Sequence, residues 1–342
     1  MVVLGGYTRL TNSGLSMTKW KPIQHKMPQS DEEWNEEFEH YKLFPEYQIQ
    51  NKNMDVEGFK KIFFVEWFHR FVGSSLGVVF TLPFAYFLYR GHIKAPFRNR
   101  LFALLGLGGS QGLIGWWMVK SGMNEKPDYQ SKPRVSVYRL LVHLNTALVI
   151  YGGLLWNGLT LIRKPQELLL KPEHLKGNKT LRFLGIMLLH CIALNTLSGA
   201  CVAGIDAGKV FNDWPFYNGQ LLPPNMMEKI PAIKNIFENR GTVQFNHRTF
   251  GYLTFTVGLI TLLKGRKLNL MRHQRIYLYI MFGLISLQVA NGIATLLHGV
   301  KPMEANAHQM MAICVLTSAI LMTHSARKPS KLYGMYLNKF IV

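Results

Sequence analysis

Four histidines, each near the start of a long apolar segment, are the residues whose spacing most clearly indicates chemistry: His69, His143, His247 and His308. Two of them begin the same motif, His-Arg-x-x-Gly, which covers residues 69–73 and again 247–251. Imidazole nitrogen binds haem iron well, and a helix bundle can supply both axial ligands from two facing helices. The four histidines therefore predict two haem-iron sites, provided that the helices pair in the order in which they occur.

Repetition separates these histidines from structural ones. A single histidine in an apolar helix belongs more often to the packing than to a metal site, whereas four at matched positions favour ligation. Zinc is disfavoured because it needs a tighter cluster of three or four ligands. The three cysteines, Cys191, Cys201 and Cys314, form no Cys-x-x-Cys pair, so neither a zinc site nor a disulfide framework is expected.

Charged residues beside the histidines have explanations that the sequence leaves open. Glu66 precedes His69 by three residues, so the two side chains share one helix face. Its carboxylate could be functional, or it could be solvated at a membrane interface. Arg70 and Arg248 directly follow two of the histidines. They could bind the propionates of a haem or extend to lipid phosphate, and both interpretations carry equal weight.

The elements that must position these residues are membrane-length helices. The chain has 342 residues, of which 48% are hydrophobic and only 17% charged, and apolar stretches alternate with charged loops. About 20 helical residues cross a hydrocarbon layer of about 30 Å. Seven stretches meet this length approximately: 62–89, 101–119, 138–162, 183–203, 247–263, 276–297 and 307–323. We therefore expect an all-α polytopic membrane protein.

The net charge of +20 is explained by membrane topology, and we expect no nucleic-acid partner. Basic residues gather in alternate loops, at 90–100, 163–182 and 264–275, and in the tail 326–342. By the positive-inside rule these segments face the cytoplasm or the mitochondrial matrix. The acid-rich loop 13–61 then lies on the opposite side, and the four histidines lie near that side.

The chain also matches itself, which indicates an internal duplication. Besides the repeated His-Arg-x-x-Gly motif, Gln111-x-x-x-Gly115 recurs as Gln288-x-x-x-Gly292, and the segment that begins at Gly6 resembles the one that begins at Gly199. We expect two tandem four-helix bundles, residues 1–165 and 180–325. Eight helices are intended in this arrangement, and the first is truncated at the start of the chain.

With these residues in view, the chain resembles the haem A synthase family. The resemblance covers nearly the whole chain and includes the segment Gly-Gly-x-Thr-Arg-Leu-Thr-x-Ser-Gly-Leu-Ser-Met at 5–17, Glu-Trp-Phe-His-Arg at 66–70, Val-His-Leu at 142–144, Asn-His-Arg at 246–248 and His308. The Thr-Arg-Leu-Thr segment together with Glu-x-x-His-Arg is quite specific. The loop motifs at 33–38 and 44–47 are similar to the mitochondrial and related bacterial form.

The resemblance implies oxidation of the C8 methyl of haem O to a formyl group by successive hydroxylations, which gives haem A for cytochrome c oxidase. His69 and His143 would hold haem O as the substrate, with Glu66 beside the reacting methyl, and these three are the expected catalytic residues. His247 and His308 would hold a resident haem b, with Arg70 and Arg248 as further cofactor-binding residues. Glu66 could position water, shuttle a proton or stabilise a cationic intermediate.

The resemblance also implies a location and partners. We expect a multi-pass protein of the mitochondrial inner membrane with its histidines toward the intermembrane space, or of the inner membrane if the source is bacterial. An electron donor such as a ferredoxin system is expected, as are contacts with haem O synthase and oxidase assembly factors, and homo-oligomers are compatible with this reading.

Two other functions use the same histidines. A dihaem b-type electron-transfer cytochrome needs all four but has no use for Glu66, and a haem transporter or chaperone would make the N-terminal site a binding site only. The second half has Val243 or Gln244 where the first has Glu66. An electron-transfer cytochrome should have similar residues in both halves, so this asymmetry favours an enzyme.

Overall fold

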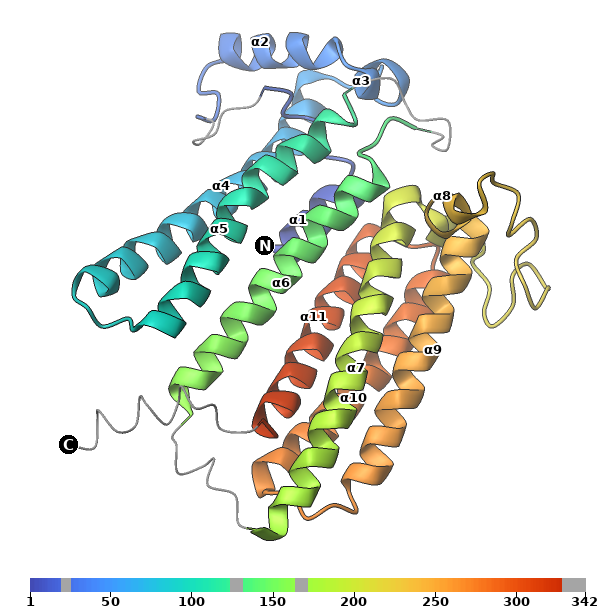
Figure 1. Cartoon of the computed structure of the whole chain (residues 1–342). Helices are drawn as coiled ribbons and strands as arrows, with labels where there is room; N and C mark the ends of the chain where they lie inside the picture. The colour runs from blue at the N-terminus through green and yellow to red at the C-terminus, as the bar shows by residue number, and fades with distance from the viewer. Residues whose placement is uncertain (20–25, 124–131, 164–171, 328–342) are drawn as a thin grey trace.

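The computed structural model describes residues 1–19, 26–123, 132–163 and 172–327. These residues form helices and no β-strand, and six of the helices are long and apolar enough to cross a membrane. The predicted all-α polytopic membrane fold is confirmed (Figure 1). The helices are α1 (Val2–Leu10), α2 (Asp31–Lys42), α3 (Pro45–Ile49), α4 (Val56–Tyr89), α5 (Ala95–Lys120), α6 (Val137–Ile162), α7 (Pro172–Ile205), α8 (Asn235–Glu238), α9 (Arg240–Gly265), α10 (Arg272–Leu297) and α11 (Pro302–Ser325).

Each of the seven predicted spans lies within a helix, but two details differ from the prediction. Helix α4 starts at Val56, where the Asp55 side chain accepts a hydrogen bond from the Gly58 N–H and caps the helix. His69 therefore lies more than three turns into its helix, at about 3.6 residues a turn. Helix α9 is 26 residues long but is not among the six apolar ones, because small and polar residues such as Thr254 and Thr261 form its buried face.

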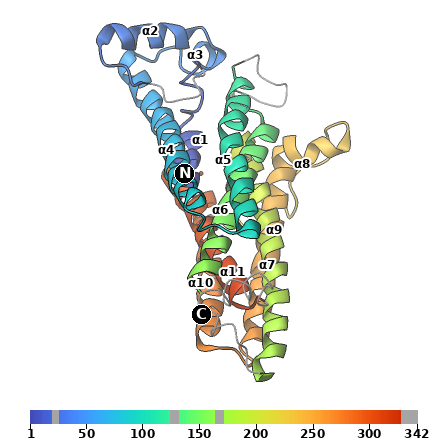
Figure 2. The same ribbon diagram turned by 60° about the vertical axis from the view of Figure 1, so that its left-hand side comes forward.

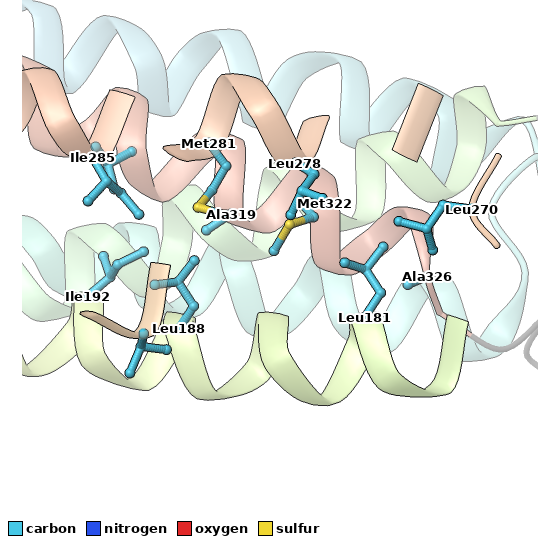
Figure 3. Close-up of a cluster of buried hydrophobic side chains, with 12 residues drawn as sticks. Leu181, Leu188, Ile192, Leu270, Leu278, Met281, Ile285, Ala319, Met322 and Ala326 are labelled. Atoms are coloured by element: carbon cyan, nitrogen blue, oxygen red, sulfur yellow. The ribbon is translucent and has the colours of Figure 1, made fainter. Parts of the chain in front are cut away.

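The C-terminal four long helices, α7, α9, α10 and α11, pack around one apolar core. Leu181 and Leu188 of α7 meet Leu278 and Met281 of α10 and Met322 of α11 in this core (Figure 3). All five side chains are fully buried. Helix α6 contacts α7 and α11, and α1 contacts α11 and α4, so the rest of the chain is attached along this bundle. Figures 1 and 2 show the α4–α5 hairpin inclined away from it.

A helical cap, α2 and α3, lies across the end of α4 that precedes the histidine (Figure 1). It is held by an aromatic cluster in which Trp34, Phe38 and Tyr41 of α2 pack on Phe59 and Phe63 of α4. The acidic side chains of α2 remain at the surface, and Ser30 caps the helix by accepting from the Glu33 N–H. The cap belongs to the predicted substrate half, residues 1–165, and lies over the end at which α4 begins.

Candidate functional site: paired imidazoles in two related bundles

Each of the four predicted ligand histidines packs against a glycine of a neighbouring helix. If a Cβ were added to the glycine, it would lie 3.0 Å from Cε1 of His69 at Gly5, 3.2 Å from that of His143 at Gly115, 3.0 Å from that of His247 at Gly199 and 2.7 Å from that of His308 at Gly292. Distances this short leave no room for a side chain unless the ring moves. Glycine at these positions therefore fixes how closely each imidazole lies against the next helix.

These contacts relate the two halves residue by residue. Gly5 on α1 serves the first histidine of its half as Gly199 on α7 serves the first of the other, and Gly115 corresponds to Gly292 in the same way. The sequence comparison had matched Gly6 with Gly199, which is wrong by one residue. Gly6 instead lies against the Gln309 side chain of α11. The domain boundaries at 165 and 180 stay a prediction, since one of them falls in residues 164–171, outside the described part.

The C-terminal pair has the geometry of two ligands to one metal. The ring centroids of His247 and His308 lie 6.4 Å apart, with their planes at 87°. Metal–imidazole bonds of about 2 Å on each side require centroids roughly 6 Å apart. Ser198 Oγ lies 3.0 Å from His247 Nδ1, which leaves Nε2 of that ring for a ligand bond. The ring separation is that of two imidazoles on opposite sides of one iron, with the Gln288 amide nitrogen 3.3 Å from His308 Nε2 in this structure.

The N-terminal pair has one ring with a polar partner and one without, as the C-terminal pair does. The Gln111 amide can donate to His143 Nδ1 at 2.9 Å, and the matching Gln288 lies 3.3 Å from His308 Nε2. His69 Nδ1 is buried with no hydrogen-bond partner. Within the described residues, the rings of His69 and His143 make no direct contact of the kind seen in the C-terminal pair. The pairing of His69 with His143 therefore stays a prediction.

Glu66 is almost completely buried, at 4% exposure, and the two oxygens of its carboxylate have different surroundings. Its Oε1 accepts a hydrogen bond from Arg70 Nε at 2.7 Å, and a terminal nitrogen of Arg70 donates to the Met17 carbonyl at 3.1 Å. The loop that carries Gly14 lies over the other oxygen, since a Cβ at Gly14 would be 3.9 Å from Oε2. The motif at 5–17 thus closes over the Glu66 carboxylate.

In the second half Gln244 takes the place of Glu66. Its Oε1 accepts from Arg248 at 3.2 Å, four residues along the helix, as Glu66 accepts from Arg70. Its amide nitrogen donates to the carbonyls of Ala207 and Phe211, each at 3.0 Å. The alternative that the sequence left open is therefore settled in favour of Gln244, and the second half has a neutral amide where the first has a carboxylate.

Both arginines bind protein groups. Arg248 donates to the carbonyls of Phe211, Asp213 and Phe216, and its guanidinium lies 4.1 Å above the Tyr217 ring. Arg70 holds the 13–17 loop in the same manner through Met17. Contacts of Arg70 and Arg248 with propionates or lipid phosphate stay predictions. In each half the arginine holds the loop that follows the helix carrying the first glycine. Arg70 holds the loop after α1, and Arg248 holds the loop after α7.

A buried ionic network joins the cap to both halves. Glu46 of α3 is 3% exposed and accepts a hydrogen bond from the Tyr41 hydroxyl at 2.9 Å. Burial raises the pKa of Glu46 to about 7, against the opposing effects of the Tyr41 hydrogen bond and of the nearby Arg9 and Arg134. Arg134 forms an ion pair with Asp206 beyond the end of α7. Sequence reasoning missed this network because its members lie in four separate segments.

The other side chains that could bind a metal form no cluster in the part of the chain that the structure describes. Among the described residues, no group of three or more histidine, cysteine, aspartate or glutamate side chains converges as a metal site, and the three cysteines are free.

Taken together, the fold and the site define a class: an all-α, multi-pass membrane protein with partly buried imidazoles that repeat in two related helix groups. The chain belongs to the COX15–CtaA family, described as cytochrome oxidase assembly protein, whose family model matches residues 1–320. It is 42% identical to "Heme A synthase COX15" of Arabidopsis thaliana, over 96% of this chain and 72% of the relative. The human protein of that name is 41% identical over 96% and 80%, and "Heme A synthase" of Roseobacter denitrificans is 40% identical over 92% and 81%.

Proposed function

We propose that this protein is a haem A synthase, which oxidises the C8 methyl of haem O to a formyl group. The names of its relatives support haem A synthesis for cytochrome oxidase. The single observation that carries the finer proposal is the asymmetry of the repeat: two nearly equivalent glycine–histidine arrangements, of which only the first has a buried carboxylate, Glu66, at its edge. A dihaem electron-transfer cytochrome accounts for the histidines but not for this carboxylate.

The N-terminal half is proposed to hold haem O through His69 and His143. Each hydroxylation replaces a C–H bond of the methyl by a C–O bond and moves a proton at the reacting carbon or oxygen, so a side chain that can accept and return a proton is useful beside it. Glu66 Oε1 is bonded to Arg70, which leaves Oε2 as the proton-accepting atom. The 13–17 loop over that oxygen limits its contact with water, and Arg70 stabilises the charged form of the carboxylate.

The C-terminal half is proposed to hold a resident haem b, which supplies one-electron transfer when bound. His247 and His308 are the ligands, and the Ser198 hydroxyl orients the His247 ring. Arg248 and Gln244 hold the loop above this site. We propose that electrons come from a ferredoxin-type donor, that haem O synthase and oxidase assembly factors are partners, and that the histidine end faces the intermembrane space of mitochondria or the outer face of a bacterial inner membrane.

The decisive experiment replaces Glu66 in a cell that lacks its own synthase. With Glu66→Ala we expect the resident low-spin haem to remain and haem A to fall by a factor of about 10²–10⁴, the range of general acid–base catalysis. Extracted porphyrins are separated by chromatography to measure this. The control is Glu57→Ala, an exposed glutamate of the same helix that pairs with Lys60. Normal haem A in the Glu66 variant would refute the catalytic role.

A further inference from the structure

The segment between α7 and α9, residues 206–239, exposes large apolar side chains while it buries polar ones such as Asn235 and Asn239. It exposes a set of large apolar residues, here called the apolar patch: Leu221, Leu222, Met227, Ile230 and Ile233. Ile230 is 89% exposed and Leu221 79%. A loop that met only water would bury such side chains or replace them with polar ones, and contiguous exposed apolar surface marks an interaction site.

The apolar patch is displayed by a well-tied backbone. The fully buried Asn235 side chain accepts from the Lys229 N–H at 3.0 Å and donates to the Lys229 carbonyl at 2.9 Å. Asn239 donates to the Asn225 carbonyl at 2.7 Å while it caps α9 by accepting from the Thr242 N–H. These two side chains fix the backbone around residues 225 and 229, so the outward direction of the apolar residues is a fixed feature.

The loop of the first half shows that this sorting is not general at this end of the molecule. There the cap buries its aromatic residues Trp34 and Phe38 against α4, and its exposed face carries acidic residues such as Glu32 and Glu36. The two loops leave the same end of related helix groups, and the first exposes only Leu43 and Ile49 as large apolar residues among the described residues of its cap, beside a mainly acidic surface. A common aqueous environment does not account for both.

The position of the loop indicates what covers the apolar patch. Figures 1 and 2 show it projecting sideways from the ends of α7 and α9, beyond the helix bundle. Trp214 Nε1 donates to the hydroxyl of Tyr252, an exposed residue of α9, at 3.0 Å, so the loop is joined to the outward face of that helix. Trp and Tyr of this kind mark the membrane–water interface. A part that extends sideways at this level lies over lipid.

We propose that the apolar patch inserts into the boundary between phospholipid headgroups and acyl chains at the histidine end of the protein. Exposed Lys234 directly follows Ile233 and carries the charge that phospholipid phosphates attract, whereas Lys229 lies inside the patch beside the exposed Glu228. The same loop supplies the carbonyl groups that Arg248 holds beside His247. Lipid contact at the apolar patch therefore stabilises the loop that covers the His247–His308 site.

The test uses the full chain in vesicles of phosphatidylcholine and phosphatidylglycerol. The native cysteines, Cys191, Cys201 and Cys314, are replaced by alanine, and single cysteines are introduced as Ile230→Cys or Ile233→Cys and labelled with an environment-sensitive fluorophore. Glu36→Cys on α2 is the matched control at the same end. We expect blue-shifted emission from positions 230 and 233, several-fold stronger quenching by a lipid-borne spin label, and little quenching by aqueous iodide. Position 36 should behave oppositely.

Two results would overturn the proposal. If iodide quenched the labels at 230 and 233 as strongly as the label at 36, the patch would be in water. If the labels were shielded in native membranes but exposed in the pure-lipid vesicles, a protein and not lipid would cover the patch. Retention of the haem spectrum in each labelled variant would show that the protein is folded, and the outcome does not depend on haem A formation.

Discussion

The two halves of the molecule place histidines on glycines in the same way but surround them with different polar groups. In the C-terminal half Ser198 bonds His247 Nδ1, and His308 Nδ1 has no partner. In the N-terminal half Leu4 occupies the place that matches Ser198 and His69 Nδ1 has no partner, whereas the Gln111 amide can donate to His143 Nδ1. A ligand held by a hydrogen bond is oriented before its metal arrives. Each half therefore orients one ring of its pair, the first histidine in the C-terminal half and the second in the N-terminal half.

The second difference concerns charge. Glu66 and Gln244 accept a hydrogen bond from the arginine that follows in each half, so the scaffold does not require a carboxylate at this position. A buried carboxylate costs more to maintain than a buried amide. Its presence in only one half therefore indicates chemistry there, and the comparison teaches that duplication preserved the packing while the polar groups diverged.

The largest effects are expected from removing ligands, and they should differ between the halves. His247→Ala should abolish the low-spin resident haem, because the paired ring is lost, and haem A with it. His69→Ala should leave that haem in place and abolish only haem A. Reduced-minus-oxidised spectra of the purified proteins distinguish the two. An equal loss of resident haem in both variants would contradict the division between halves.

A smaller, graded effect is expected at the glycines. Gly292→Ala places a Cβ 2.7 Å from His308, and Gly199→Ala one 3.0 Å from His247, so each must displace the ligand ring. Altered support of a metal ligand typically costs 10–100-fold in affinity. We expect haem loss in that range, larger for Gly292→Ala, with changed g-values in electron paramagnetic resonance.

The matched control is on the same helix. A Cβ at Gly283 of α10 meets nothing within 4 Å, so Gly283→Ala should leave haem content and spectrum unchanged. If Gly292→Ala and Gly283→Ala behaved alike, the glycine contact would have no role in orienting the ring.

Ser198→Ala should have a smaller effect, because it removes one hydrogen bond and leaves the packing. We expect about tenfold weaker retention of the resident haem. The converse change, Leu4→Ser, offers His69 the hydroxyl that it lacks and should slow release of haem from the N-terminal half. Both are measured as the rate of haem transfer to an apo-globin acceptor. Unchanged rates in both variants would remove Ser198 from the explanation of the asymmetry.

The sequence was sufficient for features that depend on residue type and repetition. The matched histidines, the order of the helices and the repeated Gln111 and Gln288 all follow from spacing along the chain. The polarity of Gln111 and Gln288 inside apolar segments was the signal, and the structure places each beside a ligand histidine. Hydropathy alone found the α9 segment less reliably, because its buried face consists of small and polar residues.

Features that depend on packing between helices were beyond the sequence. Gly199 has no periodic signal that distinguishes it from other glycines of apolar segments, and its contact with His247 appears only when α7 meets α9. The one-residue error between Gly5 and Gly6 has the same cause. The carbonyl partners of Arg248 were also hidden, since backbone groups of an irregular loop leave no trace in residue identity.

The smallest expected effect concerns the buried ionic network that joins the cap to both halves. The pKa of Glu46 is raised from 4.5 to about 7 by burial, so between these values the folded protein binds a proton that the unfolded chain has lost. The stability of the cap should therefore fall as pH rises from about 4.5 to 7. Glu46→Gln keeps an acceptor for the Tyr41 hydroxyl and cannot ionise, so this fall should disappear.

Limited proteolysis of the cap at a series of pH values measures this effect, with the C-terminal half as an internal reference. We expect cleavage between α2 and α4 to speed up from pH 5 to pH 7 in the unchanged protein and to be nearly constant in Glu46→Gln. The opposite slope in the unchanged protein would mean that Arg9 and Arg134 stabilise the carboxylate more than burial disfavours it. The network would then be a permanently charged ion cluster that holds the cap to the end of α7. The two halves would then differ in the polar contacts above their histidines as well as in those beside them.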